Sequence, residues 1–424
     1  MRLTRVFLSV FVCLLAAKVC FAYVPEPQTE GKFFPSKGTM ASEEYEAKAG
    51  MPVYEYGKGI QWGPVHFKPE LNYSYRWDSN VFYEDTNNES DYVNTLNGNL
   101  LAELPFAGGQ HLLSAAYGFR REWFSRFNTQ NHTDHKGTVG LNLNFVPFTL
   151  DLEDTYERTE SRANTEFTER ILRDENAFHS LLEIPFASFF LENEITDFDI
   201  SYDRPSDAVF DHNLFTIYQR IGYDMTPNTQ LLGEYAYVGV WYDQDTFGDR
   251  DGDAHQYMLG MRGKLTERIA YQVWGGAQHR IYDDSVRPDF NGFITRGALQ
   301  WDPNEGNRIL LRGTREPVES TFDNQSFYTR NRGQLTWRRQ IAERWFFNLN
   351  GSLEYHEYSR ITVLPGESAT RRDTSWDTGT GLEYRMPNDL VSLTLDYRHV
   401  GRDSNLVGLD YDGDEISAGV RAAF

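Results

Sequence analysis

The sequence from residue 65 to residue 424 is divided into segments in which polar and apolar residues alternate. A period of two is typical of a β-strand that has one apolar and one polar face. The connections alternate between short turns, such as "TPNT" at 226–229, and long acidic stretches, such as "DQDTFGDRDGD" at 243–253. Because no helical period accompanies this pattern after residue 22, the sequence predicts an all-β fold.

Eighteen strands are predicted, with eight short and nine long connections between them. They are residues 65–76, 92–104, 111–124, 135–146, 148–157, 176–184, 187–200, 211–225, 230–242, 254–265, 268–282, 290–301, 307–318, 325–338, 343–358, 372–386, 390–400 and 414–424. A soluble β-sandwich has strands of about five or six residues, shorter than these. A β-helix would repeat at a fixed short period, which this sequence lacks.

An even number of antiparallel strands, with short turns at one end and long loops at the other, is typical of an up-and-down β-barrel of the bacterial outer membrane. Hydrocarbon offers no hydrogen-bond partner to a peptide group, so a sheet that crosses a membrane must close on itself. Several strands also end in a tryptophan, as an aromatic band at the membrane interface requires: Trp77, Trp241, Trp301, Trp337 and Trp376. The predicted fold class is an all-β transmembrane barrel of sixteen to eighteen strands, with eighteen preferred.

Residues 1–22 are predicted to be a secretory signal peptide. Arg2 and Arg5 precede an apolar run that ends in small residues at Ala22, where cleavage is expected. A transmembrane anchor is the less favoured alternative, because Lys18 interrupts a run that is already short. A lipoprotein signal is disfavoured because no small residue precedes either cysteine. The expected location is the outer membrane of a Gram-negative bacterium, reached by Sec-type export.

Residues 23–64 are predicted to be a flexible periplasmic segment, because they are rich in Pro, Gly, Glu and Lys and show little periodicity. The alternative is that this segment folds into the barrel as a plug. The barrel is assigned to residues 65–424. Both cysteines, Cys13 and Cys20, lie in the signal, so disulfides and thiolate sites are excluded from the mature chain.

The net charge argues against nucleic-acid binding. It is formally -21, and removal of the basic residues Arg2, Arg5 and Lys18 with the signal takes it to -24. A chain this acidic would be repelled by a phosphate backbone.

Charged residues on the polar face of the strands are predicted to line the barrel interior. One arc is acidic and includes Asp151, Glu153, Glu183, Glu192 and Glu194. A second arc, about a third of the way round, is basic and has almost no acid opposite in register: Arg262, Arg280, Arg296, Arg312, Arg330 and Arg332. Either these charges keep the interior wet and pair with their neighbours, or their separation sets up a transverse field that orients solutes in an aqueous pore.

Three inward aromatic residues, Tyr218, Trp274 and Tyr328, could stack on sugar rings or could fill space against a loop. An eighteen-stranded barrel is wide enough for an aqueous channel.

Two loops carry acids two residues apart around a glycine, which resembles part of a Ca²⁺-binding loop. The acids are Asp249, Asp251 and Asp253 in one loop and Asp410, Asp412 and Asp414 in the other. The distant bidentate glutamate is missing, and Asp-Gly is also a common turn sequence. No other cofactor is expected. The sequence has no metalloprotease, serine-hydrolase or nucleotide-binding motif, so an enzyme is not predicted.

Residues 59–104 contain Gly63-Pro64, Pro69, "DSNV" at 78–81 and "SDYV" at 90–93. With these features the segment resembles the opening of the EpsL-like, β-barrel porin-2-like proteins encoded within exopolysaccharide loci. The resemblance implies an outer-membrane barrel that, in some members, is an exit route for secreted polysaccharide.

The preferred function is therefore an outer-membrane channel for exopolysaccharide export. A general or solute-specific diffusion porin is the first alternative, and a plugged structural or surface barrel is the second. Expected partners are outer-membrane lipids and lipopolysaccharide, the barrel assembly machinery, and, for the export function, polysaccharide and periplasmic export components.

The last predicted strand ends in Phe424, on the same apolar face as Ile416, Ala418 and Val420. A terminal aromatic residue after an alternating strand resembles the signal that the outer-membrane insertion machinery reads. We expect deletion of Phe424 to lower the amount of heat-modifiable barrel in the outer membrane more than it alters the conductance of the protein that does insert. Wild-type amounts of heat-modifiable barrel in the deletion strain would contradict this expectation.

Overall fold

The computed structural model describes residues 59–162, 166, 169–244, 249–321, 325–364, 367–387 and 389–424. The predicted signal peptide and almost all of the predicted periplasmic segment lie outside these ranges. No α-helix among the described residues is long and apolar enough to cross a membrane. Two short 3₁₀ helices, η1 (Asn128–Gln130) and η2 (Ala208–Phe210), lie in long connections.

Nineteen strands form one antiparallel sheet. Their bounds are β1 Ile60–Trp62, β2 Val65–Asp78, β3 Asp91–Phe106, β4 His111–Phe124, β5 His132–Asn144, β6 Thr149–Thr159, β7 Arg173–Phe186, β8 Phe189–Tyr202, β9 His212–Thr226, β10 Thr229–Tyr242, β11 Gly252–Thr266, β12 Ile269–Tyr282, β13 Phe290–Asn304, β14 Asn307–Glu319, β15 Phe327–Ala342, β16 Trp345–Leu364, β17 Glu367–Arg385, β18 Val391–Ser404 and β19 Tyr411–Ala423.

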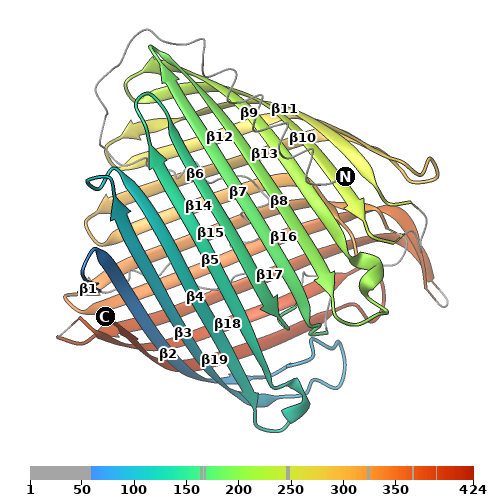
Figure 1. Ribbon diagram of the computed structural model, residues 1–424. Coiled ribbons are helices and arrows are strands. Elements are labelled where there is room, and N and C mark those ends of the chain that lie inside the picture. Colours follow the sequence, from blue (N-terminus) through green and yellow to red (C-terminus); the bar gives the residue numbers. More distant parts are fainter. Residues whose placement is uncertain are drawn as a thin grey trace.

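The sheet closes into a barrel because β19 pairs with β2, from Glu415 opposite Asp78 to Ala423 opposite Glu70. Every strand from β2 to β19 therefore has two neighbours, and the eighteen-stranded antiparallel barrel is confirmed. Figure 1 shows the blue β2 beside the red β19 at this junction. The backbone N–H of Phe424 donates to the carbonyl of Pro69 at 3.1 Å, which carries the pairing to the last residue.

The short strand β1 lies within the segment that was predicted to be flexible. It pairs only with β2, in a register that places Ile60 opposite Phe67 and Trp62 opposite Val65. Gly63 permits this turn, because it has a φ of 58°, a left-handed value that side chains disfavour. Strand β1 thus extends the sheet a few residues before the predicted boundary at residue 65.

One long connection was predicted where the structure has an extended hairpin. The strands β16 and β17 contain 20 and 19 residues, and they continue through residues that were assigned to a loop. Their pairing resumes beyond an irregularity between Glu357 and Ile361. The hairpin projects past the rim of the barrel at the right of Figure 1.

Apolar side chains cover the outer face of the barrel. Along β8, for example, Leu191 is 43% exposed whereas the next residue, Glu192, is 2% exposed. The same alternation exposes Ile221, Leu259 and Leu353 on other strands. Since exposed aliphatic side chains on a continuous band suit hydrocarbon and not water, this face is the lipid-facing one. The alternate residues point into the barrel, where the charged side chains gather.

Candidate functional site

The interior of the barrel is partly filled by the hairpin of β14 and β15, whose tip folds inward. Its tip residues bind elements well away from their own strands. Glu166, in the β6–β7 connection, accepts hydrogen bonds from the Ser320 hydroxyl and from the Thr321 backbone N–H, both at 2.7 Å. Arg250, in the β10–β11 connection, donates to the Ser320 carbonyl at 2.5 Å. The tip is therefore bound to the β6–β7 and β10–β11 connections, in addition to the hydrogen bonds between its own two strands.

A second set of contacts holds the flank of the hairpin. Glu319 forms an ion pair with Arg280 of β12. Arg287, in the β12–β13 connection, donates to the Ser326 hydroxyl at 3.1 Å. Burial, followed by repulsion from the nearby Arg250, lowers the pKa of Arg287. An arginine nevertheless stays protonated at neutral pH, so it remains a donor.

Aromatic packing fixes the base of the hairpin tip. Phe327 stacks on Tyr282 with ring centroids 6.2 Å apart and meets Phe290 edge-on at 5.6 Å. All three residues are buried inside the barrel, in one apolar cluster with Ile294 and Trp274. Trp274 fits there because its register partner is Gly260, where a Cβ would approach the indole to 2.4 Å. An apolar cluster inside a charged lumen is thus the anchor of the infolded hairpin.

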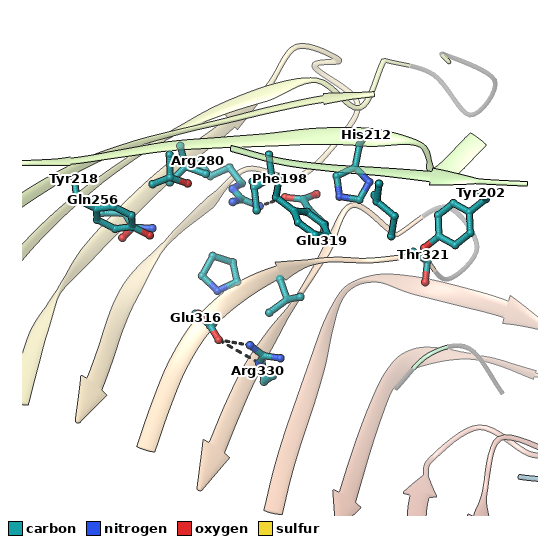
Figure 2. Close-up of a pocket in the computed structure, with 16 residues that line it drawn as sticks. Phe198, Tyr202, His212, Tyr218, Gln256, Arg280, Glu316, Glu319, Thr321 and Arg330 are labelled. Carbon is teal, nitrogen blue, oxygen red and sulfur yellow. Dashed lines mark hydrogen bonds and ion pairs between the residues drawn. The ribbon is translucent and has the colours of Figure 1, made fainter. Parts of the chain in front are cut away.

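A cavity of about 120 Å³ lies between the hairpin and the facing wall of β8 to β12. Figure 2 shows Tyr218, Gln256 and Arg280 on the wall side and Glu316, Thr321 and Arg330 on the hairpin side. The lining is mixed: it includes apolar side chains as well as both members of the Glu316–Arg330 ion pair. The cavity is therefore amphipathic.

The predicted acidic and basic arcs meet in a buried ionic cluster under this cavity. Arg220 of β9 binds Glu194 at 2.6 Å and Glu234 of β10 at 2.5 Å. Arg296 of β13 also binds Glu234, at 2.5 Å. Glu192 joins the cluster through Arg220 at 3.5 Å and also binds Arg262 of β11 at 2.7 Å. Three arginines and three glutamates are joined in this cluster, so its formal charges balance.

Burial of the cluster explains why each of its charges has an oppositely charged partner. Glu194 is fully buried, and Glu234 and Arg220 are 6% and 5% exposed. An unpaired charge in such a place would lose its hydration without compensation, which costs several kcal/mol. His179 adds a further hydrogen bond to Glu194 at 3.0 Å. The cluster thus stiffens one wall of the barrel.

The remaining predicted arginines are also mostly paired, contrary to the expectation that they lack acids in register. Arg330 lies directly opposite Glu316 and binds it at 2.5 Å. Arg332 lies opposite Glu354 and binds it at 3.1 Å. Arg312 is half-buried and forms no ion pair within the described part of the chain.

The acids on β6 and β7 lie on the other side of the lumen. Asp151, Glu153 and Glu183 are half-buried on the inward face. Asp151 accepts a hydrogen bond from Asn142, and Glu183 accepts one from Thr149 at 3.1 Å. Among the residues that the structure describes, Asp151 forms no ion pair, as Arg312 forms none. Ion pairs therefore neutralise much of the predicted separation between an acidic and a basic arc. Asp151 on β6 and Arg312 on β14 are the clearest charges that stay separate.

The three inward aromatic residues fill space. Tyr218, Trp274 and Tyr328 are only 4%, 3% and 2% exposed, so none presents a free face to a sugar. The infolded hairpin covers this part of the interior. This burial favours the space-filling interpretation, although Tyr218 also lines the cavity described above.

The acidic loop residues are engaged in turns and rim contacts. Asp249 and Asp251 accept backbone hydrogen bonds from Asp251 and Tyr242, and Asp410 accepts one from Ser404. Asp253 and Asp414 bind the hydroxyls of Tyr237 and Tyr397. The backbone carbonyl of Asp412 accepts a hydrogen bond from the Asn80 side chain. Across the described ranges, no group of three or more His, Cys, Asp or Glu side chains is placed to hold a metal ion.

Two features of the site were missed at the level of sequence. Arg220 and Glu234 lie at inward positions of the predicted strands 211–225 and 230–242, so the alternation alone could have found them. Pro317, within the predicted strand 307–318, is the sequence feature that could have indicated the infolded hairpin. A proline inside a strand argues for an edge or an irregularity at that point.

A family model described as "Putative beta-barrel porin 2" matches residues 205–424, just over half of the chain. The chain belongs to this family. The predicted resemblance is thereby confirmed, although the match covers the part from η2 to β19, whereas the resemblance was drawn from residues 59–104. Family and fold together make this porin an outer-membrane barrel and indicate a channel, not an enzyme.

Solved structures with a similar architecture share little sequence with this porin. OccAB3 of Acinetobacter baumannii is 10% identical, with a TM-score of 0.46 over 86% of this chain and 100% of its own. OccK9 (OpdG) of Pseudomonas aeruginosa is 10% identical, with a TM-score of 0.47 over 85% and 98%. The alcaligin receptor FauA of Bordetella pertussis is 11% identical, with a TM-score of 0.40 over 87% and 77%. No curated protein matches the chain.

The ionic cluster leads to a prediction about stability. Replacing Arg220 by methionine leaves Glu194 and Glu234 short of their shared partner, and removing one member of a buried ion pair costs about 3–5 kcal/mol. We expect Arg220→Met to lower markedly the temperature at which the folded, heat-modifiable band disappears on an electrophoretic gel. Arg312→Met, which breaks no ion pair, is the matched control and should stay near wild type. Equal effects of the two variants would contradict this role of the cluster.

Proposed function

We propose that this porin is a diffusion channel for small hydrophilic solutes and that the infolded β14–β15 hairpin sets its size limit. The observation that carries the proposal is the set of bonds from Ser320 and Thr321 to Glu166 and Arg250, which hold the hairpin tip across part of the lumen. Solutes would pass on the other side, along β3 to β7 and β15 to β19. Inward charged side chains there, such as Arg120 and Arg338, are 28% and 36% exposed.

Charged side chains near this path would affect how polar solutes pass through it. Asp151 and Arg312 lie on strands eight positions apart in the eighteen-stranded barrel, close to opposite one another. Two charges of opposite sign on facing walls, neither of them in an ion pair within the described ranges, create a field across the aqueous path. The field would orient polar solutes, and it would weaken at high salt because ions screen exposed charges.

Export of exopolysaccharide is the second candidate, and the resemblance of residues 59–104 to porins of exopolysaccharide loci supports it. A polymer chain needs a continuous wide path, so the hairpin tip would have to move aside during export. Deletion of the gene should then abolish surface polysaccharide. Unchanged surface polysaccharide in the deletion strain would remove this candidate.

The size limit can be tested by releasing the hairpin. The double variant Arg250→Ala, Glu319→Gln removes one bond to the tip and one ion pair to the wall. We expect a higher single-channel conductance in planar bilayers and faster swelling of liposomes in larger oligosaccharides. Arg204→Ala is the control, because Arg204 is half-exposed in the β8–β9 connection and pairs with Glu169 and Asp207, not with the hairpin. An unchanged conductance in the double variant would show that the hairpin does not limit the path.

A further inference from the structure

The seam between β13 and β14 is incomplete at its outer end. The two strands pair only as far as Thr295 opposite Arg315. Yet β13 continues to pair with β12 up to Phe290, and β14 continues to pair with β15 up to Glu319. Residues 290–294 of one strand and 316–319 of the other therefore have no ladder partner across this seam.

Proline 317 accounts for the break. Extending the register of Thr295 and Arg315 by two residues would place Phe293 opposite Pro317. Proline has no N–H to donate, so the ladder cannot continue there with its full set of bonds. The side chain of Arg315 replaces part of the missing ladder, because its Nε donates to the Phe293 carbonyl at 3.2 Å and its Nη1 donates to Asn331 at 2.7 Å. The opening is therefore encoded by the sequence and is not a frayed end.

The break reaches the lipid-facing band. Phe293 is 58% exposed on the outer face. Its ladder partner on β12 is Ala277, whose own partner on β11 is Tyr257, and Tyr257 is 60% exposed on the same face. An open sheet edge is not tolerated in contact with hydrocarbon unless other groups cover it. The peptide groups of the break that Arg315 does not reach must therefore be covered from within or by a molecule of the membrane.

The inner side of the break leads to the amphipathic cavity. Pro317 and Val318, which lack partners on β13, are themselves part of the cavity lining. Apolar side chains of the facing wall, such as Phe198 and Leu214, share that lining with Arg280 and Arg330. Phe290 and Ile294, on the β13 side of the break, pack with Phe327 in the buried apolar cluster.

We propose that the outer end of the β13–β14 seam is a lateral port, through which an alkyl-chain amphiphile of the outer leaflet reaches the lumen cavity. The alkyl chain would enter past Phe293 and lie against the apolar lining, while the polar head would meet Arg280 and Arg330. In this proposal, the Phe327 ring blocks the inner end of the port, and the Arg315 side chain holds the outer end closed. This route is separate from the axial path for hydrophilic solutes.

Photo-crosslinking from inside the barrel tests the port directly. A photoreactive amino acid replaces Val318, and the matched control carries it at Leu310, an inward position of the same strand behind the intact ladder. Each protein is placed in vesicles of phosphatidylethanolamine and phosphatidylglycerol with a trace of alkyne-tagged lysophosphatidylethanolamine. We expect the tagged lipid to be captured at position 318 and not at position 310.

Closing the seam should abolish the capture. The described residues contain no cysteine, so the pair Phe293→Cys, Pro317→Cys can be joined selectively across the break by a short bismaleimide. The control pair Gly297→Cys, Gly313→Cys is joined in the same way within the intact ladder, where Gly297 faces Gly313 and both sites have room for a Cβ. Loss of capture with the first pair only, and increased capture in Phe327→Ala, would support the port.

Three results would overturn the port: absence of capture at position 318, equal capture at both positions, or capture that persists when the break is closed. Single-channel conductance serves as the independent readout. It should be the same for the two crosslinked pairs, because the axial path does not use the seam. A change in conductance with normal lipid capture would count against the proposed axial path and not against the port.

Discussion

The need to satisfy every backbone hydrogen bond in hydrocarbon governs this molecule. Each strand from β2 to β19 pairs on both sides, and the bond from Phe424 to Pro69 continues the final seam to the last residue. Closure in turn separates an apolar outside from an interior that contains the charges. The buried arginines and glutamates follow from that separation, because side chains on the inward face have only one another, the infolded hairpin and water as partners.

The packing of the interior is not uniform around the barrel. Under the hairpin, charges are buried and matched, as in the cluster around Arg220, and aromatic side chains pack as they would in a soluble core. Along β3 to β7 and β15 to β19, some inward charged side chains remain partly exposed, such as Arg338, whereas others near the long connections are buried, such as Arg173 and Arg371. In the proposed function, solutes pass these partly exposed side chains, and the hairpin of β14 and β15 borders the path.

The sequence predicted the barrel well because period-two alternation and turn residues are local signals. The inward placement of residues such as Glu192 and Arg296 follows from the same alternation. Their partners did not follow, because Arg262 binds Glu192 across two intervening strands, and that distance depends on curvature and shear that no local pattern specifies. The infolded hairpin was not predicted, for a similar reason. Pro317 marks an irregular strand, but the inward turn of the tip depends on contacts far apart in the sequence, such as those of Glu166 and Arg250.

At one seam of the barrel, the side chain of Arg315 replaces hydrogen bonds that the backbone makes at the other seams. Elsewhere, separating two strands means breaking a run of peptide hydrogen bonds together, a cooperative and slow event. At the outer end of β13 and β14, a single guanidinium stands in for those peptide groups. Exposed side chains change rotamer in picoseconds to nanoseconds. A hydrogen bond from a charged group contributes a net stabilisation of only about 1.5–3 kcal/mol. The barrel thus contains a short length of wall that thermal motion can open and reseal without disturbing the strands below it.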